Sequence, residues 1–142
     1  EGMRKMLDKL VAVHDNRVQA PSATPERNAK MTSKLRDDPD EKDEPEMEHP
    51  VVRTHPETGR KALFVCRPRT HRFKGMAETE SKPLLEFLFD HSHRPEFTCR
   101  FRWEKGSIAF WDNRCVMHKA LNDYPGQKRY MNRVTVNGTR PV

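Results

Sequence analysis

Two arginines near the end of the chain have the spacing that most clearly indicates chemistry. Residues 129–136 are typical of a final β-strand, and side chains two positions apart on a strand point to the same face. Arg129 and Arg133 therefore share a face with Met131 and Thr135. A buried guanidinium needs an anionic partner, and its planar fork suits a carboxylate, a sulfonate or a phosphate. If this face is exposed to solvent, the two arginines are ordinary surface charges, and the strand pattern leaves both interpretations open.

A single histidine lies close to these arginines in the expected arrangement. His118 ends a neighbouring expected strand at residues 115–118. A lone histidine is more often structural than a metal ligand. If the two arginines bind anions, however, an imidazole beside them favours a metal site that holds an organic acid. His118, Arg129 and Arg133 are therefore the candidate site residues.

Two other groups of residues have the composition of a metal site. His55 and Glu57 spell H-x-E inside an expected turn. His91 and His93 lie at the end of an expected helix, with Cys99 nearby. Zinc would require three or four well-placed ligands there.

Several short motifs occur in the order and spacing of one known family. They are 49–59 (HPVVRTHPETG), 94–97 (RPEF), 101–103 (FRW), 111–114 (WDNR), 118–120 (HKA), 122–124 (NDY), 127–129 (QKR) and 133–135 (RVT). With these motifs the chain closely resembles the taurine dioxygenase-like family of Fe(II)- and 2-oxoglutarate-dependent oxygenases. The resemblance is strong over residues 49–142 and weak over residues 1–48. It implies that His55 and Glu57 lie in a turn of the family and that His91 and His93 lie at a helix end, so we expect neither group to bind a metal.

The resemblance implies a role for each candidate residue. His118 is similar to the distal histidine of the family's two-His-one-carboxylate iron site, which leaves coordination positions open. Arg129 is similar to the arginine that pairs with the far carboxylate of 2-oxoglutarate, and Arg133 to the one that binds an anionic substrate. The implied reaction hydroxylates taurine or another small sulfonate or carboxylate, with Fe(II) as cofactor and with 2-oxoglutarate and dioxygen as co-substrates.

The family's other two iron ligands come from an H-x-D motif, which this chain lacks. We therefore expect residues 1–142 to be a single partial taurine dioxygenase-like domain, the C-terminal portion of such an enzyme, and to be inactive alone. The alternative is a truncated, non-catalytic product that acts as a binding module or is an inert relic. The chain begins at Glu1, which also indicates a processed chain or a fragment.

The expected fold class is mainly β with flanking helices. The helical spacing of Met3, Met6, Leu7, Leu10 and Val11 predicts an amphipathic helix over 3–14, within a first zone at 1–20. Residues 21–50 are rich in proline and acidic groups and predict a polar surface excursion.

Residues 51–142 predict short strands with one helix at 79–91. The strands are expected at 51–54, 62–66, 97–103, 107–111, 115–118 and 129–136. This pattern suggests a sandwich or jelly roll, and with the resemblance it predicts the C-terminal part of a double-stranded β-helix, incomplete in this chain.

Composition narrows the classes of protein to which the chain can belong. Of the 142 residues, 34% are hydrophobic and 34% charged, and no run approaches the ~18 apolar residues that a membrane span needs. The net charge of +6 leaves nucleic-acid binding open, but the aromatic side chains of 97–103 alternate with the arginines, which favours a core face. Three sparse cysteines favour a reducing cytoplasm. We expect no nucleic-acid or membrane partner, and leave open whether the complete protein is a homo-oligomer.

Overall fold

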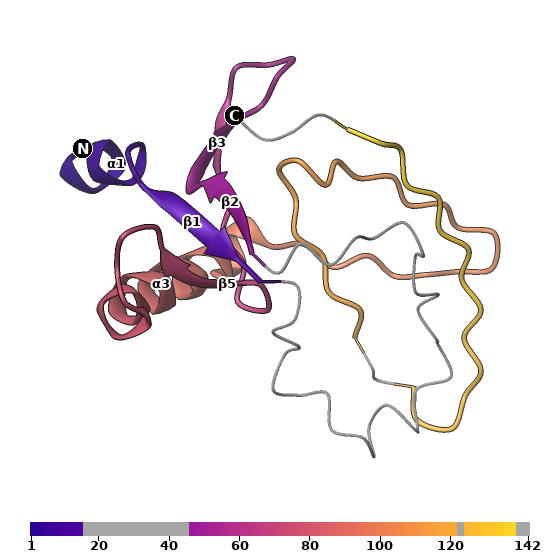
Figure 1. Ribbon diagram of the computed structural model, residues 1–142. Coiled ribbons are helices and arrows are strands. Elements are labelled where there is room, and N and C mark those ends of the chain that lie inside the picture. Colours follow the sequence, from indigo (N-terminus) through magenta and orange to yellow (C-terminus); the bar gives the residue numbers. More distant parts are fainter. Residues whose placement is uncertain (16–45, 122–123, 139–142) are drawn as a thin grey trace.

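A computed structural model describes residues 1–15, 46–121 and 124–138 of this chain. The described elements are α1 (Gly2–Leu7), β1 (Val11–His14), β2 (Met47–Pro50), β3 (Val52–Thr54), β4 (Lys61–Leu63), β5 (Thr70–Phe73), α3 (Glu78–Ser92) and the 3-10 helix η1 (Pro95–Phe97). They gather on one side of Figure 1, and residues 98–121 and 124–138 run as mostly extended chain on the other side. Strands outnumber helices, and no described helix is long and apolar enough to cross a membrane.

Five strands form two small antiparallel sheets. In the first, β1 lies between β2 and β5, so that Ala12 is opposite His49 on one edge and Phe73 on the other. In the second, β3 pairs with β4 through the expected turn at 55–59. Gly59 adopts φ +67° there, a backbone conformation that glycine reaches without steric cost.

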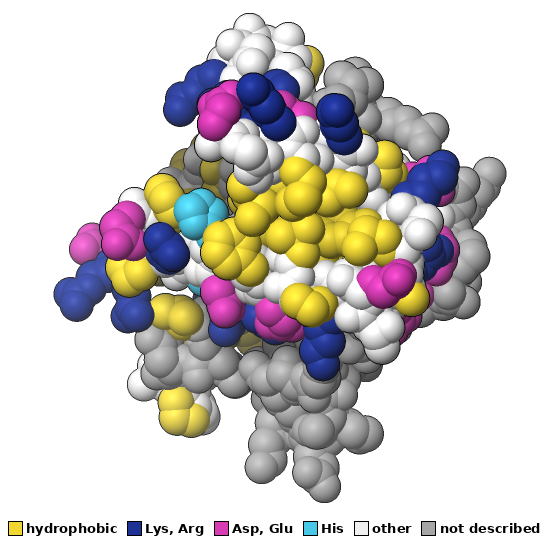
Figure 2. Space-filling view, turned by 90° about the vertical axis from the view of Figure 1, so that its left-hand side faces the viewer, with side chains coloured by type: hydrophobic (Ala, Val, Ile, Leu, Met, Phe, Trp, Pro, Cys, Tyr) yellow, Lys and Arg dark blue, Asp and Glu magenta, His cyan; other side chains and the backbone are white. Residues whose placement is uncertain are grey.

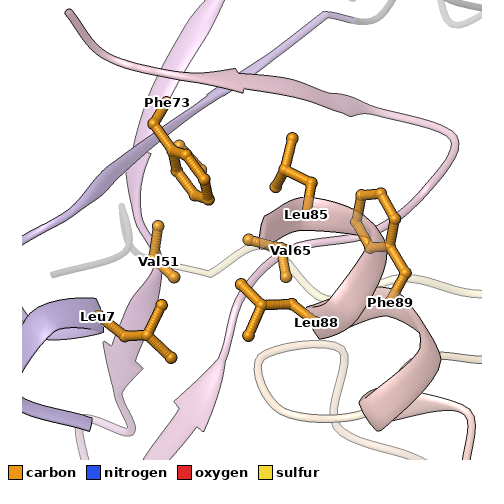
Figure 3. Packing of buried hydrophobic residues seen from close by; sticks show 8 residues of the cluster. Leu7, Val51, Val65, Phe73, Leu85, Leu88 and Phe89 are labelled. Atoms are coloured by element: carbon orange, nitrogen blue, oxygen red, sulfur yellow. The ribbon is translucent and has the colours of Figure 1, made fainter. Parts of the chain in front are cut away.

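The hydrophobic core lies between the sheets and α3. Phe73 and Val51 are fully buried and face Leu85 and Leu88 of the helix (Figure 3). Leu7, Ala12, Val65 and Phe89 complete the cluster of buried side chains. The expected helix at 79–91 is thus confirmed within one residue at each end, and Leu85, Leu88 and Phe89 form the face that packs on the core.

The N-terminal prediction is half wrong. The helix ends at Leu7, and Val11–His14 form the central strand of a sheet instead of two further helical turns. Valines at 11 and 13 favour a strand, and pairing on both edges outweighs the helical spacing. Of the expected stripe, Leu7 is buried, whereas Met3 and Met6 are 45% and 42% exposed.

Figure 2 views the side on which α1 and α3 lie in Figure 1. Hydrophobic side chains gather near the centre of this face, and charged side chains surround them. Met3 and Met6 of α1 and Phe87 of α3 are exposed large hydrophobic residues on these helices. The helices therefore present apolar surface to solvent as well as to the core.

Most of the expected polar excursion at 21–50 lies outside the described residues. Its last part is a strand, because Met47–Pro50 pair with β1. The expected strand at 62–66 is shorter, ending at Leu63, and the strand Thr70–Phe73 was not expected at all. Residues 16–20 of the first expected zone also lie outside the described part.

The expected strands at 97–103, 107–111, 115–118 and 129–136 are wrong for this structure, which has no strand among the described residues after Phe97. A strand requires a partner for its backbone N–H and C=O groups, and no described segment pairs with these four. Their apolar side chains are consequently open to solvent: Ile108, Phe110 and Val134 are 89%, 94% and 93% exposed.

A small group of buried polar side chains lies beside the first sheet. His14 is 6% exposed, and its Nε2 lies 3.1 Å from the hydroxyl of Thr70. Its ring meets His49 edge-on at 4.9 Å and stacks on Phe64 at 5.8 Å. Burial, reinforced by His49, lowers the pKa of His14 to about 4 from the usual 6.5.

We predict that Ser81→Ala destabilises the fold by about 1–3 kcal/mol. Ser81 is fully buried, and its hydroxyl accepts a hydrogen bond from the backbone N–H of Phe73 at 3.0 Å. The variant leaves that N–H buried without an acceptor. Ser92→Ala is the matched control, because Ser92 only donates to the Leu88 carbonyl within α3. Urea unfolding followed by the helix signal measures both, and equal losses would contradict the prediction.

We predict that the free energy of unfolding falls as the pH is lowered from 6.5 to about 4. In this window the unfolded chain protonates His14, whereas the folded chain keeps it neutral. The maximum loss is about 3 kcal/mol. His14→Gln should flatten this part of the profile, and the exposed His93→Gln should not. An unchanged slope in His14→Gln would refute the assignment.

Candidate functional site

The structure places His118 on extended, exposed chain instead of on a strand. Its imidazole contacts the indole of Trp111, with ring centroids 4.8 Å apart and ring planes inclined by 48°. No group of three candidate metal ligands within the described ranges includes His118. His118 is therefore a single accessible metal-ligand candidate whose ring contacts an aromatic side chain.

The two candidate arginines are also exposed, and each has its own neighbour. The guanidinium of Arg129 lies over the ring of Tyr124 at 5.7 Å. Arg133 donates from Nε to the hydroxyl of Thr135 at 3.3 Å, in agreement with the expected common face of these two residues. Over the described part of the chain, no hydrogen bond or ring contact joins Arg129, Arg133 and His118, so the structure does not assemble them into one site.

A tightly bonded network lies close to His118 in sequence. The carboxylate of Asp112 accepts a hydrogen bond from Nη2 of Arg114 at 2.7 Å, and the single N–H of Nε is shared between its two oxygens, at 2.9 and 3.0 Å. Nε2 of His55 lies 3.0 Å from the same carboxylate. Nη1 of Arg114 reaches Glu57 at 2.8 Å, which completes a four-residue network of His55, Glu57, Asp112 and Arg114.

The hydrogen bonds of this network fix the tautomer of His55. Its Nδ1 accepts from the backbone N–H groups of Glu57 and Thr58, at 3.3 and 3.2 Å. The neutral ring therefore carries its proton on Nε2 and donates it to Asp112. Hydrogen bonds from Arg114, and then from His55, hold the pKa of Asp112 well below its usual range. Arg114 likewise lowers the pKa of Glu57, and both carboxylates raise the pKa of Arg114.

The same region contains the one group of three candidate metal ligands in the described residues. Ligand atoms of His55, Asp112 and Cys115 lie within 4.8 Å of one another. Their chemistry does not fit a metal, because Nε2 of His55 carries a proton and Arg114 already neutralises Asp112. We interpret the group as a hydrogen-bonded network.

Two further expectations concern metals. His91, His93 and Cys99 do not form a group of three candidate ligands within the described part of the chain, and the expectation against zinc stays a prediction. No group of three candidate ligands in that part includes His118, so an Fe(II) site with two histidines and one carboxylate is not assembled among these residues. The imidazole suits iron, and the set is not complete in these residues.

Sequence reasoning missed the network, although it singled out both segments that form it. From the sequence, the chemistry considered for His55 and Glu57 is only that of an H-x-E metal motif, and none is assigned to Asp112 or Arg114. The residue types did carry a signal. One loop holds His55 and Glu57 and the other holds Asp112 and Arg114, so each loop offers an acidic residue and a side chain that can donate to the acidic residue of the other. Nothing in the spacing says that these loops meet.

Comparison with known proteins adds independent information. The model of the family "Taurine catabolism dioxygenase TauD, TfdA" matches residues 1–135. An alpha-ketoglutarate-dependent sulfate ester dioxygenase of Pseudomonas putida is 40% identical over all of this chain and 46% of its own length. An alkylsulfatase of Acinetobacter baylyi is 35% identical over 97% of this chain and 43% of its own length.

A solved structure agrees with these relatives. The crystal structure of a taurine dioxygenase from Burkholderia xenovorans superimposes with a TM-score of 0.58 at 38% identity, covering 80% of this chain and 32% of that one. The chain spans less than half the length of the curated relatives it matches here.

Proposed function

Because this chain belongs to the TauD/TfdA family of taurine catabolism dioxygenases, we propose that it is the C-terminal part of a 2-oxoglutarate-dependent dioxygenase. The observation that carries the proposal is the 40% identity, over the whole chain, to a dioxygenase named for sulfate esters. The proposed substrate is a small organic anion such as a sulfonate, a sulfate ester or a carboxylate. The proposed site of action is the cytoplasm, which fits the three free cysteines.

The proposed fold of the complete protein is a double-stranded β-helix to which residues 97–136 contribute strands. Support comes from the alternation of apolar and polar side chains at 97–103 and from the exposed apolar groups of this region. Contiguous apolar side chains open to solvent indicate a surface that another segment covers. The matched length of the relatives leaves ample chain to provide it.

We propose that His118 is one of three ligands to Fe(II) in the complete protein. Its neutral imidazole offers a nitrogen lone pair, and the contact with Trp111 restricts the ring. The other two ligands come from residues outside the described set. The bound metal would supply the redox chemistry that couples oxidation of 2-oxoglutarate to hydroxylation of the substrate.

The proposed role of Arg129 is to bind the far carboxylate of 2-oxoglutarate, and that of Arg133 is to bind the anionic substrate. A guanidinium stays charged at any working pH and can donate two parallel hydrogen bonds to a carboxylate or sulfonate. In the structure neither arginine has an acidic partner among the described residues, so both charges are available to a ligand.

The first test is to sequence the native transcript upstream of the codon for Glu1. An in-frame H-x-D motif on an expected strand would supply the two missing ligands and support the enzyme. A verified start close to Glu1, with no such motif, would contradict it and favour a non-catalytic product.

We predict that Arg129→Ala and Arg133→Ala separate the two anions. In the protein that contains the complete iron site, Arg129→Ala should raise the KM for 2-oxoglutarate about 30-fold or more, since removing one partner of a buried charge pair costs about 2 kcal/mol or more. Arg133→Ala should instead raise the KM for the organic anion. The exposed Arg100→Ala is the control. Unchanged KM values in both variants would remove the assignment.

A further inference from the structure

Among the described residues, one cluster of side chains joins the segment that carries His118 to the folded strands. The side-chain hydrogen bonds and ion pairs that join residues 99–121 and 124–138 to the rest of the described chain run to His55 and Glu57 of the turn between β3 and β4. Each spans 57 positions of sequence. The partners on the other side are Asp112 and Arg114.

The side chains that make this connection are partly buried and held by several hydrogen bonds. The side chain of His55 is 12% exposed, and those of Asp112 and Arg114 are 32% and 29% exposed. Arg114 holds both oxygens of Asp112, and His55 is itself held by two backbone N–H groups. Isolated surface ion pairs contribute little, whereas bidentate, interlocked pairs fix geometry.

Short-range contacts connect Asp112 to His118. The carbonyl of Asp112 accepts from the backbone N–H groups of Cys115 and Val116, at 3.2 and 3.0 Å, which closes a turn. On the other side of Asp112, the indole of Trp111 donates to Asn113 and packs against the His118 ring. His118 therefore rests on a residue directly bonded to the anchored aspartate.

We propose that His55, Asp112 and Arg114 are positioning residues, which hold the 111–118 segment so that the imidazole of His118 stays against Trp111. The functional consequence, a correctly placed iron ligand, rests on the proposed function. The positioning itself does not, because it concerns only contacts within this chain.

The test follows the His118 ring by NMR in the 142-residue chain. The current of the Trp111 ring displaces the His118 ring-proton resonances from those of a free histidine, and His118→Gln identifies them. We expect Arg114→Ala to abolish this displacement. Arg67→Ala is the matched control, since Arg67 also bridges two carboxylates, Glu86 and Asp90, but lies outside the network. A displacement retained in Arg114→Ala would overturn the proposal.

A second pair of variants tests the proposal if Arg114→Ala unfolds the chain, as loss of the helix signal of α3 would show. His55→Gln keeps an N–H donor near the position of Nε2, whereas His55→Phe keeps a ring and removes the donor. We expect the His118 displacement to persist in His55→Gln and to vanish in His55→Phe. The same result in both variants would overturn the proposal.

A metal titration separates this inference from the proposed function. In the protein with the complete site, Arg114→Ala should weaken Co(II) binding about tenfold, in the range seen for residues that support a ligand, and Arg67→Ala should not. If His118→Gln leaves Co(II) affinity unchanged while Arg114→Ala still displaces the His118 ring, the iron ligand is wrong and the positioning stands. If Arg114→Ala weakens binding no more than Arg67→Ala does, the positioning has no functional consequence.

Discussion

Pairing of β1 on both of its edges is the constraint on which the folded part of this chain depends. With β2 on one side and β5 on the other, the backbone groups of Val11–His14 are satisfied, and Ala12 and Phe73 are brought into one core. Phe73 then provides the surface against which α3 packs. Residues 98–121 and 124–138 contain comparable apolar patterns, but no described strand pairs with them, and apolar side chains such as Ile108, Phe110 and Val134 stay in solvent.

This difference explains which parts of the fold could be predicted from the sequence. The helix at 79–91 and the turn at 55–59 depend on local signals, namely periodicity, acidic residues at the helix start and a glycine with positive φ, and both are correct. Val11–His14 had helical spacing but became a strand because of partners far along the chain. Residues 97–103 had strand spacing and lack partners in the described residues. The periodicity of apolar residues shows which face of a segment can be buried. Whether the segment becomes a helix or a strand depends on whether another strand pairs with it.

The site divides in the same way. Side-chain type and strand spacing mark His118, Arg129 and Arg133 as candidates for a metal and for anions, and the resemblance to the family supplies the role of each. The network of His55, Glu57, Asp112 and Arg114 could not be found from the sequence, because its two halves are separated by 57 positions. Charge and hydrogen-bond capacity are local properties, whereas meeting of two loops is a property of the fold.

Electrostatics connects the exposed apolar side chains of the C-terminal region with the two exposed arginines. Two unit charges 4 Å apart attract by about 1 kcal/mol in bulk water and by about 4 kcal/mol at the effective dielectric constant near a protein surface. Arg129 and Arg133, exposed as they are here, would therefore hold an anion weakly. The cover that would hide Ile108, Phe110 and Val134 would also remove water from these arginines. In the proposed complete protein, burial of the apolar faces and binding of the anions would thus follow from the same contact, made to a segment that Asp112 anchors.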